Sequence, residues 1–349
     1  MAVTIDDVAK KAGVASSTVS RVFNNKGRIS EETRQRVLEV AKDLNYQPRK
    51  YEKKKQVILN NNIFIIYNKK TQVENNIFYN EVMEGLEQIL SENQYNLLFK
   101  TISGEKEKDQ QIIDFILNSD DKAGIIFLGF LGYEMDNDII VSIKEKGIPL
   151  ILIDNILLEQ DVDCVVTDNY YGAIKGVNYL IELGHKEIAF IGGPLSHVSL
   201  NERYMGYKTA LKRAGFEKKD HLVKICDPDF LVEEGYQATL EIFNNDEKNP
   251  SAIFAANDDL ATGVLKAANE TGIIVPGQLS VLGFDDVYFS RHTTPPLSTI
   301  KVFKRQMGRE AAKRLLELIN GISTKPMKDI VTTELVVRGS TGKPPISLD

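Results

Sequence analysis

The first 46 residues carry apolar side chains at helical spacing. The pattern predicts one helix over residues 5–12, a break at Gly13 and a second helix over 16–23. Ser30 is a good N-cap residue, so a third helix is expected to begin there. That helix must end before Pro48, because proline and the residue before it disfavour a helix. The chain therefore opens with a small unit of three short helices.

From about residue 63 the pattern changes to apolar, strand-like runs that alternate with amphipathic helices. This alternation predicts parallel sheets with right-handed crossovers, and the stretch is long enough for two similar, doubly wound α/β lobes. Ligands of such sheets lie beyond the carboxyl ends of the strands, so a site is expected where the lobes face each other. Strands are predicted at 63–67, 95–101, 123–129, 149–154, 164–167, 187–193, 222–226, 252–256 and 279–284, and helices at 81–90, 108–117, 173–183, 204–214 and 261–268.

The changes of pattern also predict domain boundaries. A charged stretch, RKYEKKKQ, separates the helices from the lobes, and its composition allows either a solvated tether or a weak helix. The chain is expected to return to the first lobe near Pro295. The expected segments are a helical domain at 1–48, a linker at 49–61 and a body at 62–349, whose lobes comprise 62–168 with 295–325 and 169–294 with 326–349.

Charge is distributed unevenly along the chain. Residues 1–56 contain thirteen Lys and Arg against seven Asp and Glu, so this segment carries +6 and the remainder −12 of the total of −6. A basic head on an acidic body is typical of a nucleic-acid-binding module on a carrier. A solvated basic face, which is common, would give the same balance.

Composition narrows the class of protein. Hydrophobic residues make up 42% and charged residues 26% of the 349 residues, as in soluble globular proteins. The apolar runs are too short to span a bilayer and the first residues lack the apolar region of a signal peptide, so a cytoplasmic protein without membrane contact is expected. Cys164 and Cys226 lie in apolar runs and are expected to be buried thiols rather than a disulfide or metal ligands.

The sequence contains no GxGxxG, P-loop or HExxH pattern, and its four histidines do not have the spacing of a metal site. His197 follows Ser196, but no nucleophile elbow surrounds the pair. We therefore expect a protein that is not an enzyme and needs no cofactor. A transport-type sugar-binding protein is a closer alternative, because the body alone would suit one, but such a protein would not carry the N-terminal helices.

The first two predicted helices, joined by a turn that contains glycine, have the layout of a helix-turn-helix. Gly13 can adopt the positive φ that the turn requires. Ser16, Ser17, Thr18 and Arg21 then lie at the start and on the outer face of the second helix, where a reader of the major groove presents its side chains. The guanidinium of Arg21 can pair with a guanine edge. For each serine, an ordinary polar surface residue is the alternative interpretation.

A dense set of short motifs runs through these helices: DVA at 7–9, AGV at 12–14, TVSRV at 18–22, TR at 33–34 and LNYQP at 44–48. Together they resemble the N-terminal domain of the LacI/GalR family of transcription regulators. The resemblance implies that Ser16, Ser17 and Arg21 read bases. The family's phosphate-contacting positions correspond here to Thr4, Thr18, Ser20 and Asn24.

The linker departs from the family pattern. Members usually carry a short hinge helix after this domain, with an alanine and then a leucine that wedges into the minor groove. The corresponding positions here are Glu52 and Lys55. Phosphate repels a carboxylate and lysine is not an apolar wedge, so little bending is expected at the operator centre. Lys50, Lys53 and Lys54 are expected to add phosphate contacts, which would make the affinity for DNA fall more steeply with salt concentration.

The resemblance continues through the body. It is carried by NIFY at 76–79, GPLSHVS at 193–199, AND at 256–258, GFDD at 283–286 and PPLSTI at 295–300. It implies a fold of the periplasmic-binding-protein type, with an effector site between the two lobes. The implied effector-binding residues are Phe78, Tyr79, Asp154, Ser199, Arg203, Asn257 and Asp285.

The chemistry of these side chains suits a polyhydroxylated ligand. Arg203 offers five donors and Asp285 accepts hydroxyl donors, while Phe78 or Tyr79 can stack on the apolar face of a sugar. A structural ion pair between the lobes is the alternative interpretation for Arg203 and Asp285. Val302 and Lys304 do not match the polar and aromatic residues that the lactose member carries after its crossover, so lactose-like specificity is not expected.

The family resemblance implies a homodimer that binds pseudo-palindromic, double-stranded operator DNA. A small sugar, either a mono- or an oligosaccharide, would shift the operator affinity through a change between two conformations. The expected role is repression of sugar-utilisation genes. A catabolite regulator that depends on a phosphoprotein co-repressor is a further alternative.

Overall fold

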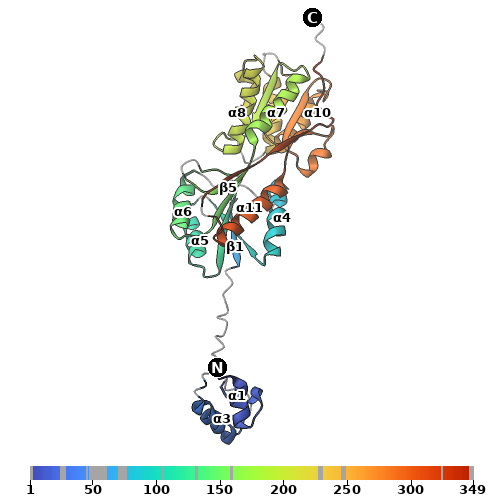
Figure 1. The fold of residues 1–349 in the computed structure, drawn as a ribbon. Helices are drawn as coiled ribbons and strands as arrows, with labels where there is room; N and C mark the ends of the chain where they lie inside the picture. The colour runs from blue at the N-terminus through green and yellow to red at the C-terminus, as the bar shows by residue number, and fades with distance from the viewer. Residues whose placement is uncertain are drawn as a thin grey trace. The chain divides into compact units, whose positions relative to one another are not determined.

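The computed structural model describes residues 3–23, 29–44, 46, 61–69, 77–103, 105–129, 133–157, 160–226, 231–244, 249–323 and 325–345. The chain divides into two compact units, Met1–Leu59 and Asn60–Asp349, and each has its own hydrophobic core (Figure 1). The first is a small helical unit, and the second is the larger α/β body.

The N-terminal unit contains the three predicted helices. The apolar stripes of these helices meet in one cluster, at whose centre Val8, Val19 and Val37 are fully buried. Gly13 has a φ of 65°, which confirms the expected turn between the first two helices. The helices are α1 (Ile5–Ala12), α2 (Ser16–Phe23) and α3 (Glu31–Asp43).

The body contains two six-stranded sheets, one in each lobe. The first sheet has the order β11-β5-β4-β3-β1-β2 and all its strands are parallel. The second has the order β12-β10-β9-β8-β6-β7, with only β12 antiparallel to its neighbour. The strands of the first sheet are β1 (Asn62–Asn68), β2 (Asn96–Ile102), β3 (Lys122–Leu128), β4 (Leu150–Ile153), β5 (Asp163–Thr167) and β11 (Lys328–Val331). Those of the second are β6 (Ile188–Gly192), β7 (Val223–Ile225), β8 (Ala252–Ala255), β9 (Ser280–Asp285), β10 (Ser298–Val302) and β12 (Thr333–Val336).

Helices cover the sheets, as the predicted doubly wound architecture requires (Figure 1). In the first lobe, α4 and α11 contribute to one cluster of buried residues, and α5 and α6 contribute to another. The helices of the body are α4 (Ile77–Glu92), α5 (Lys106–Asn118), α6 (Tyr133–Glu145), α7 (Asn169–Glu182), α8 (Val198–Arg213), α9 (Leu231–Phe243), α10 (Asp258–Thr271) and α11 (Lys304–Ile319), with 3-10 turns η2 (Asp220–Leu222) and η3 (Tyr288–Arg291).

Adjacent residues of β1 point to opposite faces of the first sheet. Ile63 and Ile65 belong to the cluster that contains α4 and α11, whereas Phe64 belongs to the cluster that contains α5 and α6. Burial on both faces explains why this strand is a continuous apolar run rather than an alternating one. Cys164 and Cys226 are buried free thiols, as predicted.

The chain passes between the lobes three times: after β5, after β10 and after β11. The expected lobe boundaries are corrected here, because residues 298–302 pair within the second sheet and residues 328–331 within the first. The return to the first lobe therefore occurs near Phe303 rather than Pro295. Hydrogen bonds to strands that are distant in the sequence fix the partner of a short strand, so periodicity alone could not assign it.

Helices α4 and α11 pack closely within the first lobe. A Cβ atom on Gly85 would collide with the backbone carbonyl of Arg305, and one on Gly308 would collide with the carbonyl of Val82. Two glycines thus allow the backbones of the two helices to touch. This packing places the first turn of α11 beside the first turns of α4, at the carboxyl ends of the strands.

Candidate functional site

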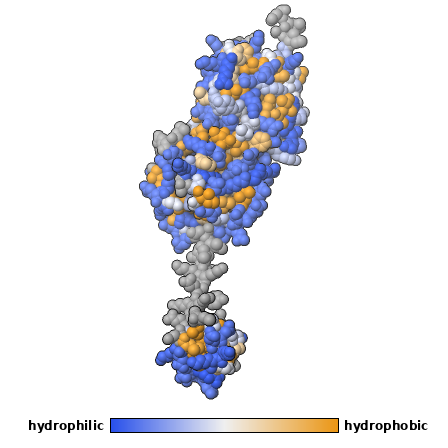
Figure 2. Space-filling view, viewed as in Figure 1, coloured by the Kyte–Doolittle hydropathy of each residue, from blue (hydrophilic) through white to orange (hydrophobic). Residues whose placement is uncertain are grey.

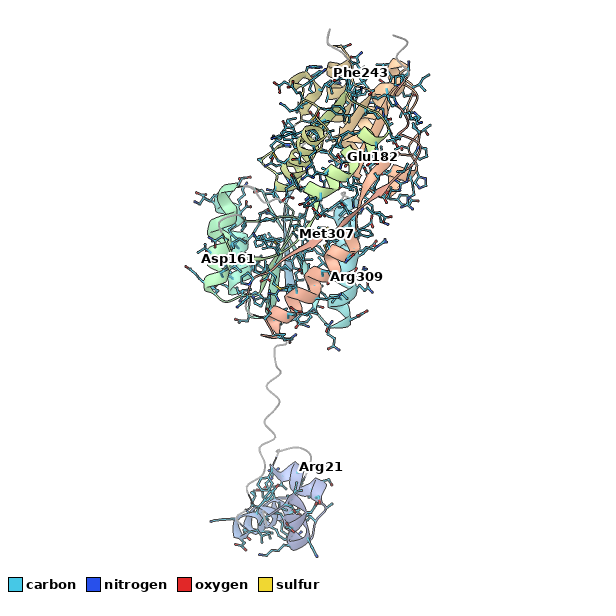
Figure 3. The ribbon with its side chains drawn as sticks, turned by 45° about the horizontal axis from the view of Figure 1, so that its top comes forward. Arg21, Asp161, Glu182, Phe243, Met307 and Arg309 are labelled. Atoms are coloured by element: carbon cyan, nitrogen blue, oxygen red, sulfur yellow. The ribbon has the colours of Figure 1, made fainter. Side chains whose placement is uncertain are left out.

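The outer face of α2 carries side chains that were expected to read bases. Arg21 (Figure 3) and Ser17 are exposed, while Val19 on the opposite face is fully buried. Thr18 and Ser20 are partly buried. A guanidinium displayed on a short, well-packed helix is available to a guanine edge, so the geometry is compatible with the expected contact.

Thr4 and Ser16 already have partners within the N-terminal unit. The Thr4 hydroxyl donates to Asp7 Oδ2 at 2.7 Å and accepts from the Asp7 N–H at 3.4 Å, which caps α1. The Ser16 hydroxyl donates to Asp6 Oδ1 at 2.5 Å and so ties α2 to α1. Any contact with DNA must use the remaining lone pairs of these oxygens or open these bonds.

The remaining residues that were expected to contact DNA lie outside the described residues. They are Asn24, Lys50, Lys53 and Lys54, and the same holds for the hinge positions Glu52 and Lys55. Their roles stay predictions.

In the body, four contacts fix the side chain of Arg203 on α8. Nε donates to Asn169 Oδ1 at 2.9 Å, and Nη1 donates to the carbonyl of Ala256 at 2.6 Å. Nη2 forms a 3.0 Å ion pair with Asp285 Oδ1, and the guanidinium carbon lies 3.8 Å from the centroid of the Phe284 ring. The hydrogen bonds and the ion pair use one N–H of each guanidinium nitrogen. Nη1 and Nη2 each carry a second N–H, which can donate to a ligand.

Asp285 ends β9 with a φ of 107°, a value that is rare for a residue with a side chain. Its backbone carbonyl accepts a 2.6 Å hydrogen bond from Lys304 Nζ, and the carbonyl of Asp286 accepts a second at 3.0 Å. Lys304 is 2% exposed and also lies 3.5 Å from Glu81 on α4. Burial raises the pKa of Asp285, while Arg203 and Lys304 act in the opposite direction.

On the first lobe, Asp154 follows β4 and accepts a 3.1 Å hydrogen bond from the Tyr79 hydroxyl. Tyr79 lies in the first turn of α4 in edge-to-face contact with Phe78, with ring centroids 5.1 Å apart. Burial raises the pKa of Asp154 to about 6, although Arg203 and the Tyr79 hydroxyl favour the carboxylate. The charge of Arg203 therefore acts on groups of both lobes.

One buried carboxylate oxygen at these strand ends, Asp154 Oδ1, has no hydrogen-bond partner among the described residues, and Asp154 is 8% exposed. Asp285 Oδ1, in contrast, lies 3.0 Å from Arg203 Nη2. A buried acceptor that lacks a donor costs roughly 1–3 kcal/mol. A ligand hydroxyl would supply such a donor.

Ser199 lies buried in the first turn of α8 and shares a 2.9 Å hydrogen bond with His197 Nδ1. Burial and the nearby Arg203 lower the pKa of His197 to about 4, against the opposing effect of Asp285. The imidazole is therefore neutral at pH 7 and can act as both donor and acceptor. The loop before α8 thus lies in the electrostatic environment of Arg203.

Asn257 has a structural role at the same edge. Its Oδ1 caps α10 by accepting from the Leu260 N–H at 2.8 Å, so a ligand contact would have to come from its amide nitrogen. The neighbouring Asp258 accepts from the hydroxyls of Ser290 at 2.5 Å and Thr299 at 2.6 Å. Burial raises the pKa of Asp258 to about 7.

Three residues near this site were not expected from the sequence to take part in it: Asn169 and Glu202 beside Arg203, and Lys304 beside Asp285. Asn169 follows the predicted end of a strand, a signal that could have found it. Its Nδ2 donates to Glu202 Oε2 at 3.2 Å, and burial raises the pKa of Glu202. Lys304 gave no such signal, because a lysine at the start of an amphipathic helix is normally exposed.

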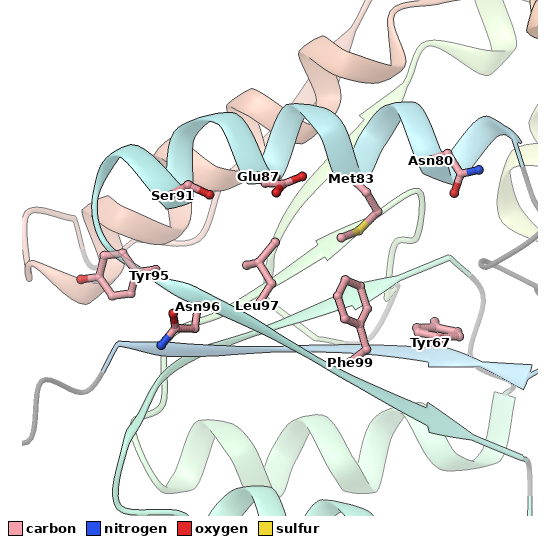
Figure 4. A pocket seen from close by; sticks show the side chains of 9 residues that line it. All are labelled: Tyr67, Asn80, Met83, Glu87, Ser91, Tyr95, Asn96, Leu97 and Phe99. Carbon is pink, nitrogen blue, oxygen red and sulfur yellow. The ribbon is translucent and has the colours of Figure 1, made fainter.

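A separate open cavity of about 740 Å³ lies between α4 and the edge strand β2 (Figure 4). Met83 and Glu87 line it from α4, and Leu97 and Phe99 line it from β2. Its lining includes none of the expected effector residues. The cavity therefore belongs to the edge of the first sheet and not to the strand ends.

Two further features of the described residues concern metal-binding groups and membrane-spanning helices. Within the part of the chain that the structure describes, no group of three or more His, Cys, Asp or Glu side chains is placed to hold a metal ion. The helices of the same part include none with the length and apolar character needed to cross a bilayer.

Known protein families match both parts of the chain. Residues 4–49 match the model of bacterial regulatory proteins of the lacI family, and residues 177–341 match a periplasmic binding protein-like domain. The chain is 33% identical to the probable HTH-type transcriptional repressor ExuR of Bacillus subtilis (strain 168), over 97% of this chain and 98% of that protein. It is 30% identical to the ribose operon repressor of Haemophilus influenzae, over 90% and 92% of the two chains.

Solved structures show the same architecture. A complex of the transcriptional regulator CelR with cellobiose has a TM-score of 0.72 and 29% identity, over 97% of this chain and 99% of that one. The lac repressor dimer bound to operator and the anti-inducer ONPF has a TM-score of 0.70 and 26% identity, over 98% and 100%. The chain is thus a DNA-binding transcriptional regulator rather than an enzyme, and it belongs to the LacI family of bacterial regulatory proteins.

Proposed function

We propose that this regulator binds a pseudo-palindromic operator as a homodimer and that a small sugar held between the lobes sets its operator affinity. The observation that carries the proposal is the grouping of Arg203, Asp154 and Asp285. A fixed guanidinium with available N–H groups pairs with the buried carboxylate of Asp285 and lies near that of Asp154, whose Oδ1 has no partner among the described residues. Sugar hydroxyls both donate and accept hydrogen bonds, so one ligand can serve all three groups. Relatives that include a ribose operon repressor and a regulator in complex with cellobiose support this ligand class.

The position of these groups supports an allosteric role for the ligand. Tyr79 and Asp154 belong to the first lobe, whereas Arg203 and Asp285 belong to the second. A ligand that contacts both sets favours one relative orientation of the lobes, and its differential affinity for the two orientations limits the shift. In a dimer, that change would alter the spacing of the two N-terminal units on the operator.

Exposed apolar side chains on β2, the edge strand of the first sheet, favour the proposed homodimer. On strand β2, Phe99 is 50% exposed and Leu98 is 37% exposed, and Met83 and Leu97 line the 740 Å³ cavity together with Phe99. The visible surface of the body also carries apolar patches among polar regions (Figure 2). A second copy of the chain would cover the exposed apolar edge. Phe99→Asp should convert the dimer to a monomer in analytical ultracentrifugation and weaken operator binding.

The test begins with operator selection from random DNA by the full chain, followed by gel shifts. A thermal-shift screen of mono- and oligosaccharides then identifies ligands, and each ligand is tested for its effect on the gel shift. Arg203→Ala and Asp285→Ala should abolish the thermal shift, whereas removal of residues 1–56 should abolish only operator binding. A ligand whose binding survives both substitutions would place the effector site elsewhere.

A further inference from the structure

Carboxylates outnumber cations at the facing strand ends of the body. Four carboxylates are grouped with two cations, namely Asp154, Asp285, Glu202 and Glu81 with Arg203 and Lys304. This imbalance determines which ligands the site can accept, because burial weakens the screening of charge by water.

Partners within the protein engage both cations. Arg203 pairs with Asp285 at 3.0 Å, and Lys304 lies 3.5 Å from Glu81. Lys304 Nζ also donates to the carbonyls of Asp285 and Asp286, so its three N–H groups have three protein oxygens to bind. Lys304 is thereby committed to the protein and is not available to an anionic ligand.

Asp154 and Glu202 have no cation as close as those that pair with Asp285 and Glu81. Within the described residues, Asp154 has only the Tyr79 hydroxyl as a hydrogen-bond donor, and Glu202 accepts from the amide of Asn169. Burial raises the pKa of both groups, and the charge of Asp154 contributes to the shift of Glu202. Burial is the largest cause of both shifts, and the charge of Arg203 opposes both.

We propose that the effector site selects neutral sugars, whose hydroxyls donate to Asp154 and Asp285, and that it rejects sugar acids and sugar phosphates. The inference rests on the proposed function, because it presupposes a sugar at these residues. Asp154 is the residue that determines specificity. A ligand carboxylate or phosphate would meet its unpartnered Oδ1 as a second acceptor of like charge, and would leave that oxygen without a donor.

The test compares matched pairs of ligands on the full chain by isothermal titration calorimetry at about pH 7.5. Each neutral sugar of a panel of aldoses and disaccharides is paired with its uronate and its phosphate ester, for example D-glucose with D-glucuronate and D-glucose 6-phosphate. For a neutral sugar that binds, we expect the dissociation constant to be at least about tenfold lower than that of its uronate or of its phosphate ester. An anion that binds as tightly as its neutral partner would overturn the selectivity and leave the proposed function intact. If no member of the panel binds, the proposed function fails, and this inference fails with it.

Variants separate the charge of Asp154 from a general effect on folding. Asp154→Asn should reduce the preference for the neutral member about tenfold, because the amide removes the charge and can donate to an anion. Asp285→Asn is the second variant, and it should raise the affinity for the anion because Arg203 then lacks its partner. Asp161→Asn is the matched control: it removes an exposed carboxylate just before β5, at the opposite end of that strand from the site (Figure 3). An unchanged preference in both Asp154→Asn and Asp285→Asn would overturn the proposal.

Discussion

Lys304 Nζ donates a 2.6 Å hydrogen bond to the backbone carbonyl of Asp285, although Lys304 begins a helix of the first lobe and Asp285 ends a strand of the second. The bond spans the junction next to the crossover from β10 to α11. The bond holds the backbone of Asp285, whose carboxylate pairs with Arg203. The orientation of the lobes and the geometry of the candidate site are therefore linked through one buried lysine.

Replacing Lys304 with methionine keeps most of the side-chain volume but removes the ammonium group. We expect the free energy of unfolding to fall by about 1–3 kcal/mol, because two carbonyls and Glu81 lose a buried donor. Urea denaturation of the unliganded protein measures the change. Lys313→Met, on the exposed side of the same helix, is the control and should change stability by less than about 0.5 kcal/mol. Equal losses in the two variants would show that the contact with Asp285 contributes nothing.

Asp154 makes the unliganded protein less stable at neutral pH. Its pKa is about 6 in the fold against an ordinary 3.8, so between these values the folded protein holds a proton that the unfolded chain has released. Stability from this group is therefore lost as the pH rises through that range. Asp154→Asn should remove this part of the pH dependence and raise the free energy of unfolding at about pH 7.5 by about 1–3 kcal/mol, while weakening sugar binding. Denaturation at about pH 4.5, 6 and 7.5 checks this, and a variant that is no more stable than the parent at the highest pH contradicts it.

Arg21→Ala should weaken binding to the selected operator by about 1–3 kcal/mol, because a bidentate contact with guanine is lost. Arg21→Lys keeps the charge but not the fork, so it should lose most of the same specificity. Gel shifts on the operator and on a scrambled duplex separate the two effects. Full specificity in the lysine variant would mean that Arg21 contacts phosphate instead of a base.

The linker lysines should affect the salt dependence of operator binding. With Lys50, Lys53 and Lys54 all replaced by glutamine, the slope of log K against log salt should fall by up to about 2.7, at about 0.9 for each phosphate contact. Binding titrations between low and moderate salt measure this slope. A slope equal to that of the parent would exclude these lysines from the interface.

Glu52 and Lys55 at the expected hinge positions predict little bending at the operator centre, because neither can act as an apolar wedge. Circular-permutation gel shifts of the complex measure the bend. Glu52→Ala combined with Lys55→Leu should increase it by restoring the usual residues. A sharp central kink in the parent complex would show that another side chain acts as the wedge.

Local sequence signals predicted much of the architecture and part of the candidate site. The residues around Gly13 predicted α1 and α2 correctly because apolar spacing, caps and a left-handed turn all act over a few residues. Arg203 and Asp285 were named from motifs, and the structure brings them within 3.0 Å of each other. Asn169 was not expected near Arg203, because its contacts with Arg203 and Glu202 depend on how α7 packs against α8.

The sequence by itself thus determined the helical head, the alternating strands and helices of the body, and the side chains on the outer face of α2. Only the tertiary structure decided that Ser298–Val302 joins the second sheet and Lys328–Val331 the first, because strand partners are chosen by backbone hydrogen bonds between distant residues. It also decided that Lys304 is buried. An ammonium group is normally solvated, and it is withdrawn from water here only because the carbonyls of Asp285 and Asp286 and the carboxylate of Glu81 converge on it from two separate parts of the chain.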